Sequence, residues 1–413
     1  MQKNMAKQTD CDLLIVGAGI VGCLLAYALL KRSPSLNIVL LDDNPEGLNN
    51  GQHPGFDARS IALSAGSCDL LDELGLWTQL KGRAQAIEDI HVSDRGFFGA
   101  VDLPRNHSAV QSKTQVFGFV IELQQIGLLL DKQLAHFKPL TRLYNSRLVA
   151  IEKQAQQVVC QLQNGQTVTA RLCIAADGAK SATRELLAIP SQLSDYGCSA
   201  IIANLCVSQA HRNKAFERFT KFGPIALLPL SNNRYSLVWS VENRDIDRLA
   251  KLDAPAFLAE LQQAFGYRAG IFKEVGKRDI YPLKLLKTEK PVTHRGLCIG
   301  NAAHSLHPVM GQGFNLGMRD LYTLALLISQ VENKQEIGDF TMLNQYWSAR
   351  RNDHNNTIAL TDSMVHIFSN SSWPFILGRN LSLQAMSCAP SLSAAIVKQA
   401  KGQFNLFNRD QQR

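Results

Sequence analysis

A glycine-rich loop near residue 300 is the stretch of this sequence best suited to hold a chemical group. Residues 298–320 read CIGNAAHSLHPVMGQGFNLGMRD, which predicts a short apolar strand, a loop, and a helix from about Asn315. Because glycine has no Cβ, the backbone at Gly311 and Gly313 can approach a bound group closely. The amide-rich, partly positive end of the helix points into the same space and favours a flat group that gains negative charge. Glycines that only pack a strand-to-helix crossover are the alternative.

A second set of glycines follows the first predicted strand, in the segment DLLIVGAGIVG. Gly17, Gly19 and Gly22 match G-x-G-x-x-G between an apolar strand and a predicted helix, and a second apolar strand ends in Asp42, twenty residues after Gly22. In this context the pattern is the dinucleotide-binding fingerprint. The glycines make the turn, admit a pyrophosphate and let helix and strand pack. Asp42 would bind a ribose hydroxyl, a role for which Asp43 competes.

An aspartate-glycine pair marks a third turn. The segment RLCIAADGAKSATRELL predicts a strand that ends at Asp177-Gly178 and a helix that begins near Ser181. A carboxylate on such a turn can accept hydrogen bonds from ribose or ribityl hydroxyls, and the serine can cap the helix. Ordinary turn residues between a strand and a helix are the alternative.

Two further groups of side chains require an interpretation. Arg59 stands directly before a helix expected over residues 61–74, where it could clamp a phosphate or shield a bound ring. A surface arginine at a helix start is the alternative. His304 and His307 are three residues apart, but no carboxylate stands at matching spacing, so we expect no metal site.

The remaining patterns predict a second lobe. Alternating apolar and polar residues around Arg95-Gly96 indicate a hairpin, and residues 199–281 read as antiparallel strands with one helix. The apolar residues of AFERFTKFGPIALLPL could line a pocket or form core. We expect an α/β fold with a Rossmann-like domain and an α+β lobe laid against it. The expected division is a discontinuous nucleotide-binding domain (9–78, 107–190 and 290–350), a substrate domain (79–106 and 191–289) and a C-terminal helical region (351–413).

The composition narrows the class of protein. With 413 residues, 46% hydrophobic and 19% charged, the chain can bury a large core. A net charge of +8 without a dense Lys/Arg run excludes nucleic acid as a partner and leaves an anionic membrane surface or an acidic partner. Nine scattered cysteines without C-x-x-C indicate reduced thiols. We expect no signal peptide and no membrane span, and a cytoplasmic protein that is soluble or peripheral at the inner membrane.

In this order and at these intervals, the three turns resemble those of the FAD-dependent aromatic hydroxylases. The string HP-x-x-GQG-x-NLG-x-RD resembles the ubiquinone-biosynthesis branch of that family. HPGFDARSIALS, HVSDRGFFG, AFERFTKFGPIALLP, GKRDIYPL and TDSMVHIFSN are similar to branch members that act on 2-polyprenyl-6-methoxyphenol. The resemblance covers nearly the whole chain and implies a para-hydroxybenzoate hydroxylase-like fold.

The resemblance also implies FAD as cofactor, NAD(P)H as the reductant and O₂ as co-substrate. It assigns the cofactor contacts to Gly17, Gly19, Gly22, Asp42, Arg59, Asp177, Gly178, Asn301, Gly311, Gly313 and Asn315. It assigns the ring-face loop to Pro308, Gly311, Gln312 and Gly313. One departure is that the family has Gly-Asp before this loop, whereas this chain has Gly300-Asn301. Asparagine can still accept the expected ribityl hydrogen bond and donate another, so we expect FAD to bind with altered affinity.

The implied reaction is para-hydroxylation of a polyprenylated methoxyphenol to the 1,4-benzoquinol, through a flavin C4a-hydroperoxide. FAD supplies the oxygen-transfer chemistry, so we assign no catalytic side chain and leave the base for the phenol open. The alternatives are a related hydroxylase acting on another ring position or another phenol, and a flavin-binding assembly subunit without turnover.

The implied substrate also suggests partners. At about 0.8 kcal/mol per buried CH₂, a long isoprenoid tail stays out of water. The substrate would therefore come from a membrane surface or from other ubiquinone-biosynthesis proteins. Residues 364–407, which combine Trp373 and Phe375 with lysines, are a candidate docking region. A C-terminal helix packed on the domain is the alternative.

Overall fold

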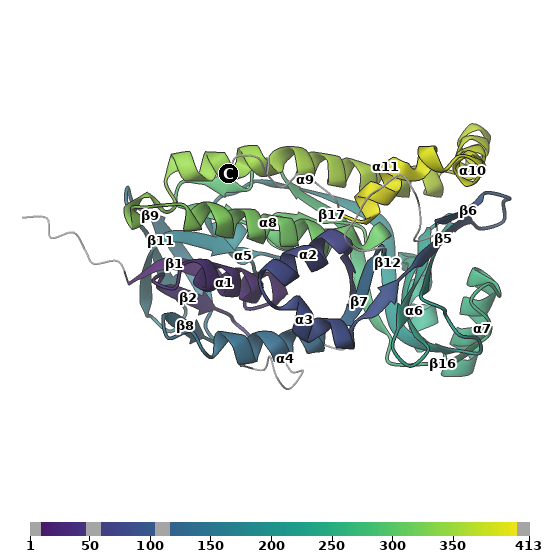
Figure 1. The fold of residues 1–413 in the computed structure, drawn as a ribbon, viewed down its shortest axis with the longest axis horizontal. Coiled ribbons are helices and arrows are strands. Elements are labelled where there is room, and N and C mark those ends of the chain that lie inside the picture. Colours follow the sequence, from purple (N-terminus) through teal and green to yellow (C-terminus); the bar gives the residue numbers. More distant parts are fainter. Residues whose placement is uncertain (1–9, 47–58, 104–115, 403–413) are drawn as a thin grey trace, which may run out of the picture.

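The structure, a computed structural model, describes residues 10–46, 59–103 and 116–402. The fold is α/β, as the sequence predicts. Figure 1 shows an elongated molecule in which two large sheets lie side by side along the long axis, with helices laid against both.

The first sheet is built around a strand that is buried on both faces. Across the sheet the strands are β18 (Val292–Thr293), β19 (Gly296–Cys298), β11 (Thr167–Ala175), β1 (Cys11–Val16), β2 (Ile38–Leu41) and β8 (Leu140–Leu143), with β10 (Val158–Leu162) and β9 (Leu148–Lys153) added beside β11. β1 pairs in parallel with β2 and β11. Leu13 and Ile15 of β1 face one core cluster, and Leu14 and Val16 face another, because successive side chains of a strand alternate. Burial on both faces explains the unbroken apolar run of β1.

Helices cover the face of this sheet that Leu13 and Ile15 share. They are α1 (Ile20–Arg32), α4 (Leu123–Leu134) and α8 (Gln312–Ser329). α1 lies between the other two and contacts both. On the opposite face, Leu14 and Val16 share a core cluster with residues of β9, β10 and β11, and β10 pairs antiparallel with both β9 and β11. A turn at Asn164-Gly165 joins β10 to β11, with Gly165 at a φ of 84°.

The second sheet forms the lobe that the sequence predicts. Its strands in order are β20 (His304–Ser305), β17 (Asp279–Thr288), β12 (Ser191–Val207), β15 (Arg234–Glu242), β14 (Gly223–Leu230), β13 (Lys214–Thr220), β5 (Asp89–Asp94) and β6 (Ala100–Leu103), with β16 (Phe272–Val275) beside β12. One face is covered by α6 (Asn243–Lys251) and α7 (Ala254–Phe265), where Phe216 packs edge-on against Phe265 with ring centroids 5.7 Å apart.

The second sheet departs from the predicted antiparallel pattern at one pair. β13 and β5 run parallel, because β5 enters the sheet from a separate, earlier excursion of the chain and no hairpin joins the two strands. That β5 and β6 share a sheet with strands of residues 191–289 supports our proposed substrate domain.

The prediction of a helix over residues 61–74 is wrong in its first part, because residues 60–64 form a strand of a small third sheet. Its strands are β3 (Ser60–Ser64), β7 (Gly118–Glu122) and β4 (Gln85–Ile87). Residues 60–64 pair with β7 instead of forming a helical turn, and the helix begins only at α2 (Ala65–Glu73), followed by the short α3 (Trp77–Leu80). Ser64 caps α2 by accepting a hydrogen bond from the backbone N–H of Ser67 at 3.2 Å. Strand pairing, which is tertiary, overrode the helical spacing.

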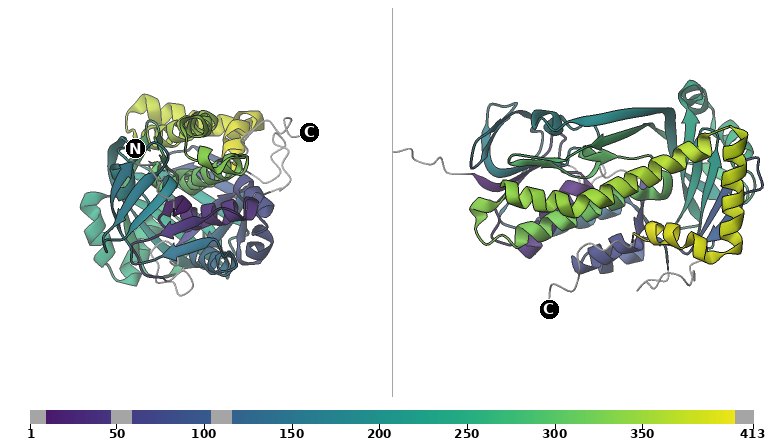
Figure 2. Two further views of the ribbon diagram at one scale, coloured as in Figure 1. Left: turned by 90° about the vertical axis from the view of Figure 1, so that its left-hand side faces the viewer. Right: turned by 90° about the horizontal axis from the view of Figure 1, so that it is seen from above.

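The C-terminal helices connect the two large sheets. α9 (Phe340–Ser369) packs on α8 and continues to β13 and β14. Figure 2 shows this long helix from above, running along the molecule. α10 (Trp373–Cys388) and α11 (Pro390–Ala400) close the far end. Asn380 of α10 accepts a hydrogen bond from Gly99 N at 2.6 Å, which anchors the helix to the β5–β6 hairpin. Among the described residues no helix has the length and hydropathy to cross a bilayer. All nine cysteines are free.

Candidate cofactor and substrate site

The three glycine-bearing turns meet around one cavity of about 780 Å³, which we call the cofactor cavity. Gly17 and Gly19 reach it from the end of β1, Asp177 and Gly178 from the end of β11, and Gly313 from the start of α8. β1 and β11 are parallel neighbours, so their carboxyl ends reach the same edge of the sheet, where α/β folds bind nucleotides. The structure therefore brings together motifs that are far apart in the sequence.

The space above these turns fits a phosphate-bearing group. Among the described residues, a Cβ placed on Gly19, Gly178 or Gly313 meets no atom within 4 Å, so open volume lies directly over the backbone. The N-cap residue of α1 is Gly19, which has no side chain to cap the helix, so the backbone N–H groups of the first turn can bind an anionic ligand such as a pyrophosphate. Gly22 does not line the cavity. Its Cβ would lie 1.9 Å from the carbonyl oxygen of Gly17, so this glycine permits the close packing of α1 on the turn.

The two adjacent aspartates at the end of β2 both line the cofactor cavity but have different environments. Asp42 is buried; its Oδ2 accepts a hydrogen bond from Ala18 N at 2.5 Å, and its Oδ1 accepts one from Asn44 N at 2.8 Å. Asp43 is half-exposed and pairs with Arg147 at 3.0 Å. Since the carboxylate of Asp42 is tied to the glycine turn, we retain Asp42 as the proposed ribose ligand.

Asp177 organises the turn at the other side of the cavity. Its carboxylate accepts hydrogen bonds from the Ser181 hydroxyl and, at 3.1 Å, from Thr183 N. Ser181 caps α5 (Ala182–Leu186) by accepting a hydrogen bond from Arg184 N at 2.9 Å, as the sequence predicts. Gly178 has a φ of 85°, which favours glycine.

Arg59 and Asn301 also line the cofactor cavity. The guanidinium of Arg59 lies 4.9 Å from the ring centroid of Tyr281, so the arginine bridges the FAD side and the second sheet. Asn301 is exposed, lies in a short 3₁₀ turn, and lines a second cavity as well. Both positions are compatible with the cofactor roles that we propose for these side chains.

The ring-face loop separates the cofactor cavity from this second cavity of about 320 Å³, which we call the ring cavity. Gly313 and Phe314 line both, whereas Pro308 and Gly311 line the ring cavity. Gly311 and the preceding Met310 have φ values of 60° and 58°. A residue other than glycine, such as Met310, is strained in that conformation, and such strain is commonly found at functional sites.

Asn315 holds the ring-face loop in place. Its Nδ2 donates to the carbonyl oxygens of Ala62 (2.9 Å) and Gly311 (2.7 Å), and its Oδ1 accepts from Ser64 N (2.9 Å). The side chain thus ties α8 to β3 and borders the ring cavity, while Gln312 is buried and lines neither cavity. Asn315 lines the ring cavity but not the cofactor cavity.

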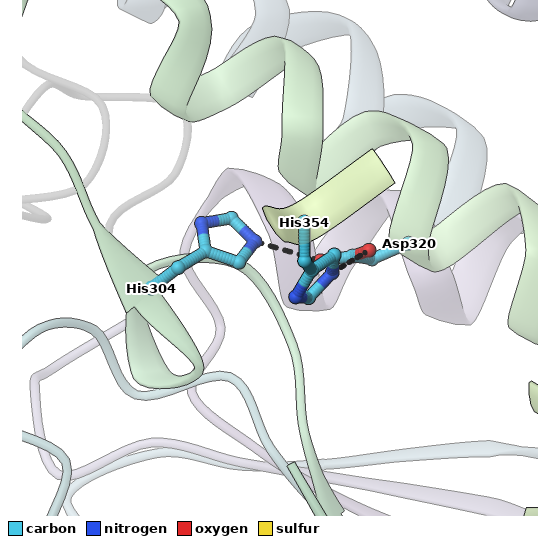
Figure 3. Close-up of side chains that lie close together, drawn as sticks. All are labelled: His304, Asp320 and His354. Carbon is cyan, nitrogen blue, oxygen red and sulfur yellow. Dashed lines mark hydrogen bonds and ion pairs between the residues drawn. The ribbon is translucent and has the colours of Figure 1, made fainter. Parts of the chain in front are cut away.

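A buried polar cluster lies behind the loop (Figure 3). His304 Nε2 lies 2.8 Å from Asp320 Oδ2, and His354 Nε2 lies 2.7 Å from Asp320 Oδ1, to which Arg350 Nε also donates at 2.8 Å. These are hydrogen-bond distances, and the guanidinium already balances the carboxylate, so the trio reads as a structural network rather than a metal site. Burial alone would raise the pKa of Asp320, but His354, Arg350 and His304 hold it well below its usual range. His307 lies elsewhere, with its ring against Tyr196.

Sequence reasoning missed one polar residue in the wall of the ring cavity. Glu217 of β13 is the one ionisable side chain among the described residues that line it. The available signal was an acidic residue within the alternating, largely apolar segment AFERF.

Comparisons with known proteins agree with this geometry. A protein family described as FAD binding domain matches residues 10–360. Ubiquinone hydroxylase UbiL of Rhodospirillum rubrum is 35% identical over 96% of this chain and 90% of its own length. The human mitochondrial ubiquinone biosynthesis monooxygenase COQ6 is 28% identical over 94% of this chain and 92% of its own length.

Solved structures show the same fold. p-Nitrophenol 4-monooxygenase PnpA of Pseudomonas putida superposes with a TM-score of 0.78 over 96% of this chain and 100% of that chain, at 16% identity. HpxO of Klebsiella pneumoniae, complexed with FAD and uric acid, has a TM-score of 0.71 over 97% of this chain and 98% of that chain, at 15% identity. NAD(P)H and O₂ are typical co-substrates of this class of enzyme. The chain belongs to the FAD-binding-domain family and is an FAD-dependent aromatic-ring monooxygenase of the group that includes the ubiquinone hydroxylases.

Proposed function

We propose that the protein hydroxylates 2-polyprenyl-6-methoxyphenol para to its hydroxyl group, which yields the 1,4-benzoquinol in ubiquinone biosynthesis. FAD, when bound, would supply the oxygen-transfer chemistry. The chain would hold the pyrophosphate on the Gly19 turn and the flavin against Gly313, and would place the phenol ring in the ring cavity beyond Phe314.

The observation that carries this proposal is a third, apolar cavity that continues from the ring cavity. It has a volume of about 610 Å³ and lies between the β5–β6 hairpin and helices α9, α10 and α11. Both cavities are lined by Val92, Leu103, Met364 and Ile396, which places them against each other. An aromatic ring in the first and an isoprenoid tail in the second would match this arrangement, so we call it the tail cavity.

The walls of the tail cavity suit a hydrocarbon chain. Its lining is almost wholly aliphatic and aromatic, with Arg379 as the one charged side chain among the described lining residues. That arginine is held by Asp94 at 2.7 Å. At about 0.8 kcal/mol per buried CH₂, each five-carbon isoprene unit placed there would contribute about 4 kcal/mol. A small polar phenol would not need this space.

The helices and the hairpin that enclose the tail cavity carry exposed apolar side chains, which support contact with a membrane surface. On α10 these are Trp373, Phe375 and Leu381, with exposures of 68%, 51% and 53%; Leu392 of α11 and Phe98 of the hairpin add to them. Exposed apolar side chains on elements that enclose an apolar cavity are typical of an interaction site. We propose that the protein works peripherally at the inner membrane or beside other ubiquinone-biosynthesis proteins, where a lipophilic substrate is available.

A metabolite profile of a strain that lacks the gene tests this function. We expect 2-polyprenyl-6-methoxyphenol to accumulate and ubiquinone to disappear, and the wild-type gene to reverse both changes. If the strain instead accumulates a phenol that lacks a hydroxyl group at another ring position, the assigned position is wrong. Rescue by a Gly19→Val variant that binds no FAD would instead indicate the alternative, an assembly subunit without turnover.

A further inference from the structure

Glu217 is a carboxyl group placed in an apolar wall. Strand registers put it in one row across the second sheet, opposite Val92 of β5 on one side and Ala226 of β14 on the other. The row continues to Val238 of β15 and Ile202 of β12. All five residues line the ring cavity. Because side chains on one face of a sheet repeat every two residues, this row presents one acidic group among four aliphatic ones to whatever occupies the cavity.

One oxygen of this carboxyl group lacks a protein partner. Its Oε1 is enclosed and accepts no hydrogen bond within the described structure, while the side chain keeps intermediate exposure because it borders the cavity. A buried polar atom without a partner is costly, so one in a ligand cavity calls for a hydrogen-bonding ligand. The opposite wall of the same cavity is the ring-face loop with Pro308, Gly311 and Gly313.

We propose that Glu217 binds the phenolic hydroxyl of the substrate and accepts its proton. The proposal rests on the proposed function, since it takes the ligand of the ring cavity to be a phenol. The O–H bond of the phenol breaks, and the proton moves to the carboxylate. The electron pair stays on the phenol oxygen and delocalises into the ring, which raises electron density at the para carbon. Once the para carbon has been hydroxylated, it releases its hydrogen as a proton to solvent, and the electron pair of that C–H bond restores the aromatic ring. Glu217 then returns its proton to the phenol oxygen.

The electrostatic environment makes Glu217 a suitable base. Burial raises the pKa of Glu217 to about 8, with no contribution from a charged neighbour. A pKa of about 8 is closer to that of a phenol, about 10, than the ordinary glutamate pKa of about 4.3 is. A base whose pKa matches that of the acid transfers protons more effectively. About half of the groups would be ionised at pH 8 and about a tenth at pH 7.

Charged groups on the elements packed against this strand are engaged elsewhere. On β5, Asp94 forms an ion pair with an arginine of α10 at 2.7 Å. On α9, Asp362 accepts a hydrogen bond from a tyrosine of β12 at 2.8 Å. β14 carries no ionisable side chain. Directly before the ring-face loop, burial lowers the pKa of His307 to about 4, so this ring is uncharged at neutral pH. Lys401, directly after α11, also has its pKa lowered by burial, and its ammonium lies 5.6 Å from the ring centroid of Phe117 in the cavity wall. Loss of the titration near pH 8 in Glu217→Gln should therefore assign it to the carboxyl group.

Steady-state hydroxylation by the FAD-loaded protein, with NAD(P)H and O₂, tests the assignment, with 2-farnesyl-6-methoxyphenol as the probe. In the wild type the hydroxylation rate should rise with pH through about 8, as the carboxylate forms. Glu217→Gln should lower kcat about 100-fold, abolish this rise and leave KM nearly unchanged, because general-base catalysis contributes a factor of this order. Glu217→Asp should restore part of kcat and the pH dependence.

A matched control and a second readout separate this role from a structural one. Arg218→Gln changes the next residue of β13, whose side chain lies on the opposite face, and should keep the wild-type rate and pH profile. Infrared difference spectra of the ligand-free protein should show a protonated carboxyl that titrates near pH 8 in the wild type and is absent from Glu217→Gln. A Glu217→Gln protein with unchanged kcat and pH profile, or with a change in KM alone, would overturn the assignment. A wild-type protein that does not hydroxylate the probe would refute the proposed function itself.

Discussion

Replacing Gly19 by valine should abolish FAD binding and leave the cofactor-free fold intact. Gly19 has a φ of −70° and a ψ of −176°, a backbone conformation that valine adopts readily, and its Cβ would meet nothing within 4 Å. The free energy of unfolding of the cofactor-free variant should therefore stay within about 0.5 kcal/mol of the wild-type value. The isopropyl group would instead occupy the open volume where we place the pyrophosphate.

The magnitude follows from linkage. FAD at 100 times its Kd should stabilise the wild-type protein by about 2.7 kcal/mol. The same FAD concentration should leave Gly19→Val unchanged. Urea unfolding with and without FAD measures this increment, and flavin absorbance after desalting measures the bound cofactor.

Two other glycines provide the controls. Gly82→Val also adds a side chain where nothing lies within 4 Å, but outside the cofactor cavity, so it should retain full yellow colour. Gly22→Val should lose stability with or without FAD, because its Cβ would lie 1.9 Å from the Gly17 carbonyl oxygen. A Gly19→Val protein that is fully yellow would refute the assigned pyrophosphate site, and one that unfolds like Gly22→Val would refute the claim of open space.

Three further changes test the site and its support. Gly313→Leu should keep FAD but lower hydroxylation about 100-fold, since its side chain enters the space between the two cavities and a small misplacement of the ring is costly; normal product formation per bound flavin would contradict this. Asp320→Ala should lower the free energy of urea unfolding by about 3–5 kcal/mol, because it removes the carboxylate from a buried ion pair with Arg350. As a control, Glu260→Ala removes the carboxylate of an exposed ion pair and should lower this free energy by less than about 1 kcal/mol. Burial lowers the pKa of His307 from 6.5 to about 4, so the unfolded chain binds a proton near pH 6.5 and the folded protein does not. As the pH falls from 6.5 to 4, the free energy of unfolding of the wild type should therefore decrease by about 3 kcal/mol more than that of His307→Gln. Equal slopes of unfolding free energy against pH in the two proteins would exclude this cause.

Local patterns in the sequence predicted much of the fold. The strand before Asp42 (β2) and the strand before Asp177 (β11) lie where the apolar runs and turn residues indicate, and Ser181 caps α5 as expected. Such signals are readable because a strand or helix buries one face at a regular spacing and glycine, proline and asparagine end it. The helix predicted to begin at residue 61 was wrong over residues 61–64, because the strand that pairs with them, β7, lies more than fifty residues away in the sequence.

The sequence by itself determined the three turns and their order, since backbone that must approach a phosphate or a flavin admits little besides glycine. Only the tertiary structure decided what faces those turns. Glu217 alternates onto one side of its strand in any sheet, but packing decides whether a cavity or a helix meets that side. Likewise, Asp320 meets His354, 34 residues away, because α8 lies against α9. Contacts of this kind depend on how separate elements pack, and no local spacing encodes them.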